Sequence, residues 1–431
     1  MAPGLGFQGA IVGYGAETVY GTPVAVTKFN ELNSDGLVVN EERIHSAAIP
    51  AIFNDDDEVS QGQINCAGDL AIEMRYQGME TLIKHAMGAV ASTEVASFVV
   101  GATNNKLDFN IGAGALVATI ASGTYIMGAS QLTALSLCKA IYDAIVSAEG
   151  TGTYTVTYST TTNKVTITRS AGTFSILWNT GTNTLVSIAA LIGFSTAADS
   201  TGGLTYTGAT ALTAVYDHVF TLADALPTGL TLEIDRDITA FTFAGGKINT
   251  MAMTIEANNF LMATFGIIAN QVANAAATAQ SLPTSPLVVF SQGAITYGGA
   301  STNVKTFNFT LNNQLSTDRR FIGSRIMAEP QRSAKIDVSG SLTLEFDDAT
   351  KYADFRAMTS RAVVLTCTGA VIKAALTYGI TINFPIVKLT GNTPTVNNAG
   401  VITVDYPFKA YASDSSSREM TITVRNSLAS V

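Results

Sequence analysis

The acidic residues of the stretch LTLEIDRDI come closest to a catalytic spacing in this sequence. Strand alternation would place Glu233, Asp235 and Asp237 on one face, because side chains two residues apart lie on the same side of a strand. The opposite face would then carry Leu232, Ile234 and Ile238. Pairs of carboxylates hydrolyse glycosides when they stand about 5–10 Å apart across a cleft. Three along one strand predict instead a polar face or, as the sharper alternative, a negatively charged wall.

A second acidic feature is the run FNDDDEV, which contains Asp55, Asp56, Asp57 and Glu58. Calcium-binding loops place carboxylates at alternate positions with a glycine at the bend, and this run has neither feature. The run therefore predicts a solvated or interface loop, with a cation site as the less favoured alternative.

Other catalytic or ligand-binding motifs are missing or out of context. The three histidines, His45, His85 and His218, are scattered, with no cysteine at a ligand spacing, so the sequence predicts no metal site. His85 is expected to be a core or helix-terminal histidine. The pattern G-x-G-x-x-G at 4–9 has no strand before it, and no G-x-S-x-G nucleophile elbow occurs. We expect no cofactor and no enzymatic activity.

The composition indicates a protein that associates with itself. Of 431 residues, 47% are hydrophobic and only 13% charged, about half the usual charged share, so surface is expected to be covered by other copies. The net charge of −9 excludes a surface that grips nucleic-acid phosphates. We expect neither a membrane helix nor a secretory signal. Three distant cysteines are expected to be buried thiols of a protein made in a reducing compartment: Cys66, Cys138 and Cys367.

The elements that would position the acidic residues occur twice. QINCAGDLAIEMRY and KIDVSGSLTLEFDD share a glycine and an apolar alternation, and Gly68 corresponds to Gly340 at an offset of 272 residues. Each stretch predicts a strand with one buried face, followed by a short helix. Glu73 and Glu345 fall on the polar faces of the two strands, so both repeats would give acidic residues to one surface.

A block of extra residues interrupts the first copy. The β-rich runs that begin at Thr231 and Thr381 correspond at an offset of only about 150, so the first copy holds roughly 120 additional residues. That block predicts a small α+β domain. Its first helix would carry Leu135, Cys138, Tyr142 and Ile145 after an N-cap at Ser130, and a hairpin would follow at YTVTYSTTTNKVTITRS. A second helix would carry Leu185, Ile188 and Leu191 and end at Gly193.

These patterns predict a mainly β protein with two tandem domains of sandwich or barrel type, each with one short helix, and a small α+β insertion domain. Residues 1–26, rich in glycine, would form an N-terminal arm. The first domain would comprise 27–96 and 217–270, interrupted by the inserted domain 97–216. A linker, 271–286, would lead to the second domain at 287–431.

Several stretches together resemble the tail tube proteins of long-tailed bacteriophages. They are GYGAETVYGTP at 13–23, GDLAIE with the short helix that ends in HAMG, PTGLTLEID, AGGKINTMAMTIEAN, and FTLNNQL followed by VSGSLTLEF. The likeness spans nearly everything except the inserted block, which is itself similar to a module that recurs in phage structural proteins.

The resemblance implies subunits that form stacked rings, whose sheets join into a β-barrel around a lumen. Tape-measure protein and then DNA would pass through this lumen, and DNA would not stick because acidic residues repel phosphates. Further partners would be the tail terminator and the distal tail or baseplate proteins, in a virion tail assembled in the host cytoplasm. The lumen-facing candidates would be Glu73, Glu233, Asp235, Asp237 and Glu345.

Two other sets of residues would make contacts between rings. A ring-stacking or lumen loop would contain Ile44, Asp55, Asp56, Asp57 and Glu58. The N-terminal arm would be ordered by a neighbouring ring and make its contacts through Tyr14, Tyr20 and Pro23.

Two tube-like domains in one chain would close a pseudo-sixfold ring with three chains, where the usual single-domain version needs six. The insertion would project outward, where it does not block the bore. A true sixfold ring remains an alternative. So do a sheath, a decoration protein or a sugar-binding adhesin, and, least favoured, a glycoside hydrolase.

Overall fold

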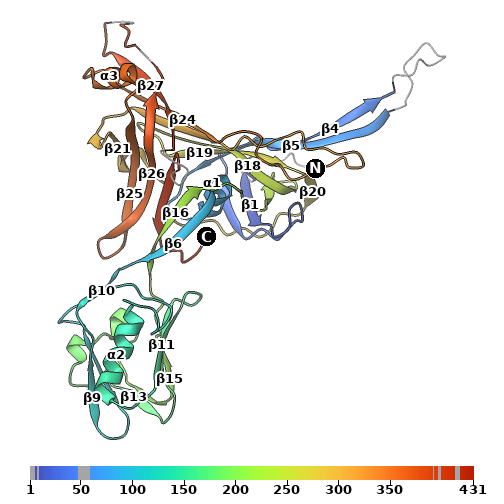
Figure 1. The fold of residues 1–431 in the computed structure, drawn as a ribbon. Helices are drawn as coiled ribbons and strands as arrows, with labels where there is room; N and C mark the ends of the chain where they lie inside the picture. Colours follow the sequence, from blue (N-terminus) through green and yellow to red (C-terminus); the bar gives the residue numbers. More distant parts are fainter. Residues whose placement is uncertain (1–4, 7–8, 47–58, 392, 397–398, 413–417) are drawn as a thin grey trace.

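The computed structural model describes residues 5–6, 9–46, 59–391, 393–396, 399–412 and 418–431. Two β-rich lobes form the body of the molecule, and a smaller domain hangs below them on two connecting segments (Figure 1). Nineteen strands of the body are joined by pairing into one network. The prediction of a mainly β fold is confirmed. None of the described helices has the length and apolar character to cross a membrane.

The first lobe is built around one very long strand, β18, which pairs with different partners at its two ends. Its elements are β1 (Ile11–Ala16), β2 (Lys28–Glu31), β3 (Ser34–Asp35), β4 (Val38–His45), β5 (Val59–Glu73), α1 (Glu80–Met87), β6 (Gly88–Val95), β16 (Val215–Leu222), β17 (Leu230–Asp235), β18 (Ala240–Glu256), β19 (Met262–Ala269) and β20 (Gln271–Ala275). Strands β4 and β5 form an arm that extends from the body (Figure 1).

The second lobe repeats part of this arrangement. Its elements are η3 (Phe290–Gln292), β21 (Gly293–Tyr297), β22 (Ala300–Ser301), β23 (Thr306–Asn312), β24 (Asp337–Glu345), α3 (Thr350–Ala357), β25 (Arg361–Lys373), β26 (Leu376–Leu389), β27 (Thr403–Ala410) and β28 (Thr421–Asn426). Pairing followed from strand to strand never returns to its start, so no closed barrel is found among the described strands.

The strand registers of the two lobes match. In the first, Leu70 of β5 pairs with Phe265 of β19, and in the second, Leu342 of β24 pairs with Tyr406 of β27. The first members of these pairs are again 272 residues apart. The match continues on the other edge of β5 and β24, where Ser34 pairs with Ala71 and Thr306 pairs with Thr343. Equal registers on both sides of a strand mean that β3–β4, β5 and β19 correspond to β23, β24 and β27.

The insertion lies where the second lobe has a tight turn. Strands β6 and β16 pair as far as Val95 and Val215, and the chain between them forms the insertion. The corresponding hairpin, β25–β26, closes at Lys373 and Leu376 with only two residues between. The additional residues therefore emerge from a hairpin tip, which leaves the ladder of the first lobe intact.

The two lobes share one hydrophobic core, whereas the insertion has its own. The shared cluster includes Leu70 and Met251 of the first lobe together with Phe309 and Tyr406 of the second, all 1% exposed or less. Aromatic rings of the second lobe pack there in a group around Phe384. The insertion core includes Trp178 and Phe109, and it reaches the body at Tyr216 of β16.

The insertion contains three small sheets and one long helix. Its elements are β7 (Phe98–Val100), β8 (Lys106–Asn110), β9 (Ala115–Thr119), β10 (Gly123–Tyr125), α2 (Leu137–Glu149), β11 (Tyr154–Ser159), β12 (Lys164–Arg169), β13 (Phe174–Ile176), η1 (Thr184–Val186), η2 (Ala189–Ile192), β14 (Ser200–Gly203) and β15 (Thr205–Thr207). The predicted hairpin is confirmed as β11–β12.

Two predictions about helices of the insertion are wrong. The N-cap of α2 is Ser136, whose hydroxyl accepts a hydrogen bond from the Lys139 N–H, and not Ser130. Leu135 therefore precedes the helix and is exposed. The second helix is instead two short 3-10 turns, although Gly193 does end the latter of them with a left-handed conformation, φ 78°.

The prediction of a disordered N-terminal arm is wrong for the strand β1. It lies between β2 and β17, and Val12 and Tyr14 are completely buried in the shared core. A side chain at Gly13 would stand 2.8 Å from the Phe29 ring, so this glycine allows the ring to pack against the strand. Glycine suggested flexibility in the sequence, but here it permits close packing. The predicted linker likewise begins with strand β20, paired to β18.

Candidate assembly surfaces

A continuous sheet crosses from one lobe to the other. The C-terminal half of β18 pairs with β19 in its own lobe and with β23 in the second lobe, from Thr250–Asn312 to Glu256–Thr306. The resulting order is β5–β19–β18–β23–β24–β27, and we call it the bridging sheet. One face packs on the shared core, which is why residues such as Phe307 and Leu342 are buried.

The other face of the bridging sheet is polar and acidic. Residues in register lie on one side of a sheet, so Glu73, Thr254, Asn308 and Ser341 share this face. Two lysines neutralise part of its charge, since Lys305 Nζ lies 2.9 Å from Glu345 and Lys409 Nζ lies 2.5 Å from Asp337. The face carries six carboxylates, those of Asp69, Glu73, Glu256, Asp337, Glu345 and Asp405.

The structure brings only two of the five predicted lumen-facing residues to this face. Glu73 and Glu345 both end their strands there, and Glu73 accepts a hydrogen bond from Asn33. Sequence reasoning missed the other four carboxylates, those of Asp69, Glu256, Asp337 and Asp405. Asp69 and Asp337 lie on the same strands as Glu73 and Glu345, so alternation could have found them. Period-two alternation says that such residues share a face within a strand, but not which strands are neighbours.

Glu233 and Asp235 lie at the other end of the sheet network. Asp235 pairs with Ala240, the first residue of β18, whereas Glu256 is its last. A strand of this length spans about 50 Å. The Glu233 carboxylate accepts hydrogen bonds from the N–H and hydroxyl of Thr278, and the Asp235 carboxylate accepts one from Gln280.

The predicted strand alternation is wrong beyond Asp235. Asp237 has a left-handed conformation, φ 67°, so the chain turns and β17 ends before it. Leu232 and Ile234 are buried as predicted, but Ile238 is 62% exposed. The Asp237 carboxylate accepts a hydrogen bond from the Leu5 N–H instead of continuing an acidic row.

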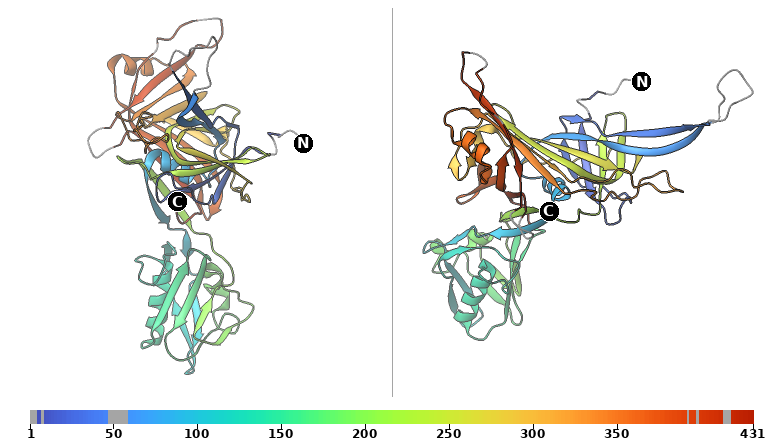
Figure 2. Two further views of the ribbon diagram at one scale, coloured as in Figure 1. Left: turned by 90° about the vertical axis from the view of Figure 1, so that its right-hand side faces the viewer. Right: turned by 45° about the horizontal axis from the view of Figure 1, so that its top comes forward.

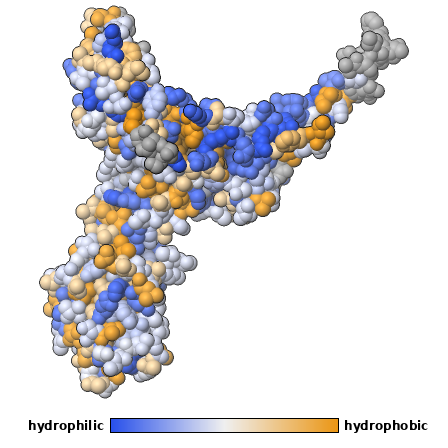
Figure 3. All heavy atoms as spheres, in the orientation of Figure 1, coloured by the Kyte–Doolittle hydropathy of each residue, from blue (hydrophilic) through white to orange (hydrophobic). Residues whose placement is uncertain are grey.

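The predicted stacking loop falls mostly outside the described residues, which include Ile44 but not Asp55, Asp56, Asp57 or Glu58. Ile44 is exposed on β4, toward the end of the arm. Hydrophilic residues gather where the arm leaves the body, with apolar residues farther along it (Figure 3).

The three residues predicted for N-terminal contacts differ in environment. Tyr14 belongs to the core, and its hydroxyl donates to the Gly78 carbonyl and accepts from Asn30, so its assignment to inter-ring contacts is wrong. Burial raises its pKa far above the usual value. Tyr20 donates a hydrogen bond to Asn270, and Pro23 is exposed.

A long loop of the second lobe, residues 313–336, braces the arm of the first. Arg325 Nε donates to the Gly62 carbonyl at 2.8 Å, and Arg320 Nη1 donates to the Ile64 carbonyl at 3.2 Å. Its equivalent in the first lobe is the connection between β4 and β5. Sequence reasoning assigned this segment no role, although its cluster of arginines in an acidic chain was a usable signal.

The C-terminal strand β28 joins the two lobes a second time, because it pairs with β16 on one side and β26 on the other. The side-chain amide of Asn426, on this strand, donates a hydrogen bond to Glu80, and its oxygen lies 3.1 Å from His218 Nε2. Burial raises the pKa of Glu80. A polar network of this kind at a seam favours one relative position of the lobes.

The insertion is held to both lobes. Glu94 on β6 accepts hydrogen bonds from the N–H groups of Met127 and Gly128. Lys373, at the tip of the β25–β26 hairpin, stands 2.9 Å from the centre of the Phe98 ring and donates to the Thr213 carbonyl. Burial lowers the pKa of Lys373 to about 8.

His85 and the three cysteines lie in the interior of the protein. His85 is 3% exposed in the last turn of α1, and burial lowers its pKa to about 3, so it is a neutral core histidine as predicted. All three cysteines are buried, as predicted, and burial raises their pKa values. Among the described residues, no group of three or more His, Cys, Asp or Glu side chains is placed to hold a metal ion.

Comparison with family models gives a match. The family model described as "Phage tail tube protein" matches residues 8–410, nearly the whole chain. No curated protein matches it significantly.

Proposed function

The chain belongs to the phage tail tube protein family and is a structural protein of the virion tail, and we propose that three copies close one ring of the tube. The observation that carries this proposal is the bridging sheet. It already joins two equivalent strand sets inside one chain, through the β18–β23 ladder. A ring of six such sets then needs only three chains.

The ring would close by repeating the same junction between chains. Residues 34–40 of the first lobe correspond to β23, and among the described strands they pair with β5 alone. In the ring, this open edge takes a strand from the second lobe of the neighbouring chain. The contact is heterologous, and a rotation that returns to its start closes it into a ring. Edge strands are then covered, which prevents uncontrolled aggregation.

The polar face of the bridging sheet would line the lumen. Three chains would place eighteen carboxylates of this face around the bore, because each contributes six. Tape-measure protein fills this space during assembly in the host cytoplasm, and DNA passes later without binding, since repulsion by the carboxylates opposes contact with phosphates. Glu233, Asp235 and Asp237 would lie near one rim of the ring instead of along the bore.

The proposed domain organisation keeps the inserted domain 97–216 on the outside of the tube. Both of its connections emerge from the β6–β16 hairpin tip, on the side of the body away from the arm (Figure 2). The first tube domain keeps 27–96 and 217–270 and gains strand β1. The second keeps 287–431, with β28 also pairing into the first.

Stacking contacts between rings would come from the arm, including Ile44 and the loop with Asp55, Asp56, Asp57 and Glu58, and from the exposed turn that carries Tyr20 and Pro23. At the two ends of the tube, the terminator and the distal tail or baseplate proteins would meet the same ring surfaces.

Electron microscopy of the concentrated protein, with end-on views averaged without imposed symmetry, tests the proposal. Three repeating units, each with two similar lobes and one outer knob, are the expected result. Six identical units would keep the tube and refute the three-chain ring. Particles that never form rings would refute the assembly itself.

A further inference from the structure

The loop 313–336 presents an apolar pair to solvent. Ile322 is fully exposed and Phe321 is 63% exposed. The loop is nevertheless held in place, because Arg320 and Arg325 on either side of the pair bond to β5, and the Ile64 N–H donates back to the Arg325 carbonyl. A rigid exposed apolar pair loses little entropy when it binds, which is the property of a docking element.

The same loop is basic in an acidic protein. It contains Arg319, Arg320, Arg325, Arg332 and Lys335 against two acidic residues, Asp318 and Glu329, for a net charge of +3. Several of these arginines bond to neutral acceptors. Arg320 uses the Ile64 carbonyl and the Asn65 amide oxygen, and Arg332 uses the carbonyls of Ala223 and Asp224. Their positive charge is therefore only partly neutralised within the subunit.

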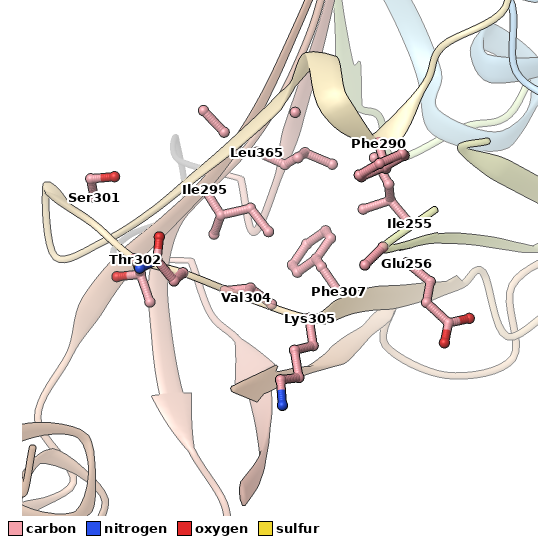
Figure 4. Close-up of a pocket in the computed structure, with 14 residues that line it drawn as sticks. Ile255, Glu256, Phe290, Ile295, Ser301, Thr302, Val304, Lys305, Phe307 and Leu365 are labelled. Atoms are coloured by element: carbon pink, nitrogen blue, oxygen red, sulfur yellow. The ribbon is translucent and has the colours of Figure 1, made fainter. Parts of the chain in front are cut away.

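A pocket lies at the opposite end of the bridging sheet. It has a volume of about 310 Å³, with an apolar floor that includes Ile255, Ile295, Phe307 and Leu365 and a polar side formed by Ser301, Thr302 and Asn303. Phe290 borders it and is 38% exposed. Glu256 and Lys305 lie on its rim, with their charged ends directed away from the apolar interior (Figure 4).

The strand ends beside this pocket are acidic, with the charge opposite to that of the loop. Of the residues that line the pocket, only Glu256 and Lys305 are charged. Neighbouring strands of the bridging sheet bring Glu345 and Asp405 on its polar face, followed by Asp347 and Asp348 just beyond β24. Lys305 is engaged by Glu345 at 2.9 Å, and Lys351 lies 3.8 Å from both Asp347 and Asp348. Two lysines against five carboxylates leave these strand ends with a net negative charge.

One strand connects the two features. Lys305 and Phe307, at the start of β23, line the pocket, and the loop begins at Asn313, directly after its end. The seven residues of β23 separate them by roughly 20 Å. A second copy displaced along the direction of this strand would thus bring its own loop toward the pocket of the first.

We propose that Phe321 and Ile322 of one subunit insert into the pocket between Ile255, Phe307 and Leu365 of a subunit in the next ring. This inference rests on the proposed function, because it requires stacked rings. The contact is heterologous, since loop and pocket stand at opposite ends of the same strand, so it propagates into a filament with a direction. Arginines around the inserted pair meet the acidic strand ends beside the pocket and orient the approach.

A double variant, Phe321→Ser with Ile322→Ser, tests the role of the loop in full-length protein. Both side chains point to solvent in the free subunit, so the subunit should fold and rings should form. The protein concentration at which rings stack into tubes should rise at least about tenfold, because two apolar side chains are no longer buried on stacking. Leu185→Ser is the matched control, since Leu185 is 96% exposed on the insertion. Unchanged tube formation by the double variant would overturn the inference.

Cross-linking tests the position of the contact. One batch would carry Ile322→Cys and the other Ser301→Cys, at the pocket, and the two would be assembled together with a short bis-maleimide. A band at twice the chain mass is expected. A batch with Val371→Cys, exposed at the far hairpin, should give none with Ile322→Cys. Native cysteines are buried and do not interfere.

The outcomes separate the two proposals. Tubes without a specific cross-link would refute the loop-in-pocket contact and leave the ring proposal standing. Wild-type protein that forms neither rings nor tubes would refute both.

Discussion

The glycine shared by the two matched strands gives a quantitative test of the packing. At Gly340 on β24, an added Cβ would lie 2.3 Å from the Asn308 carbonyl oxygen and 2.6 Å from the Phe408 ring. The backbone has no positive φ there, so the expected cost of Gly340→Ala is steric. Because the nearest atom belongs to the neighbouring strand, it cannot rotate away as a side chain would. The sheet must shift locally.

The expected loss of stability can be derived from the known cost of adding a methyl group to a tightly packed core. An extra methyl group in a tightly packed site costs about 1–3 kcal/mol, and alanine recovers about 0.5–1 kcal/mol by restricting the unfolded chain. Backbone contact at this distance places the steric cost at the upper end, so we expect a net loss of about 2 kcal/mol. For a body of about 310 residues, that corresponds to a fall of roughly 3 °C in the melting temperature.

Differential scanning calorimetry of the full chain is the assay. The insertion has a separate core, so its transition should not move and serves as an internal reference. Gly379→Ala on β26 is the matched control, because its Cβ would meet nothing closer than 3.7 Å. It should change stability by less than about 0.5 kcal/mol or raise it. Equal effects of the two substitutions would refute the steric reasoning.

Three further predictions concern other parts of the molecule. Replacing residues 96–214 by Asn-Gly should leave a folded body, because the corresponding β25–β26 hairpin needs only a two-residue turn. Calorimetry should then show the transition of the body without that of the insertion. Loss of both transitions would contradict this. Asp354→Asn should lower the melting temperature at pH 7 but progressively less toward pH 3. Hydrogen bonds from Arg361 lower the pKa of Asp354 in the folded protein. The carboxylate therefore stabilises the fold fully above about pH 4, which is the pKa of Asp in the unfolded chain, and this stabilisation is lost as the pH falls through the lower pKa of the folded protein. Lys373→Ala should let the insertion move relative to the body, because the hydrogen bond to the Thr213 carbonyl is lost. The expected signs are a larger radius of gyration in X-ray scattering and faster proteolysis near Thr213. The control Lys388→Ala, on strand β26 of the same hairpin, should change neither quantity.

The repeat of one strand could be recognised in the sequence, because alternating apolar residues around Gly68 and Gly340 are a local pattern. The alignment of Thr231 with Thr381 does not hold, since Thr381 lies on β26, the counterpart of β16, whereas Thr231 lies on β17. The burial of Leu70 and Leu342 follows directly, since a strand with one apolar face must cover that face.

Tertiary structure alone decided which strands are neighbours. Glu256 and Asp405 are distant in sequence from Glu73, and only the order of the bridging sheet places all three on one face. Val12 and Tyr14 looked like part of a flexible arm because glycines surround them, yet the glycines admit the Phe29 ring and let the strand enter the core. Local sequence specifies the period of a strand, whereas its partners are set by packing between segments far apart in the chain.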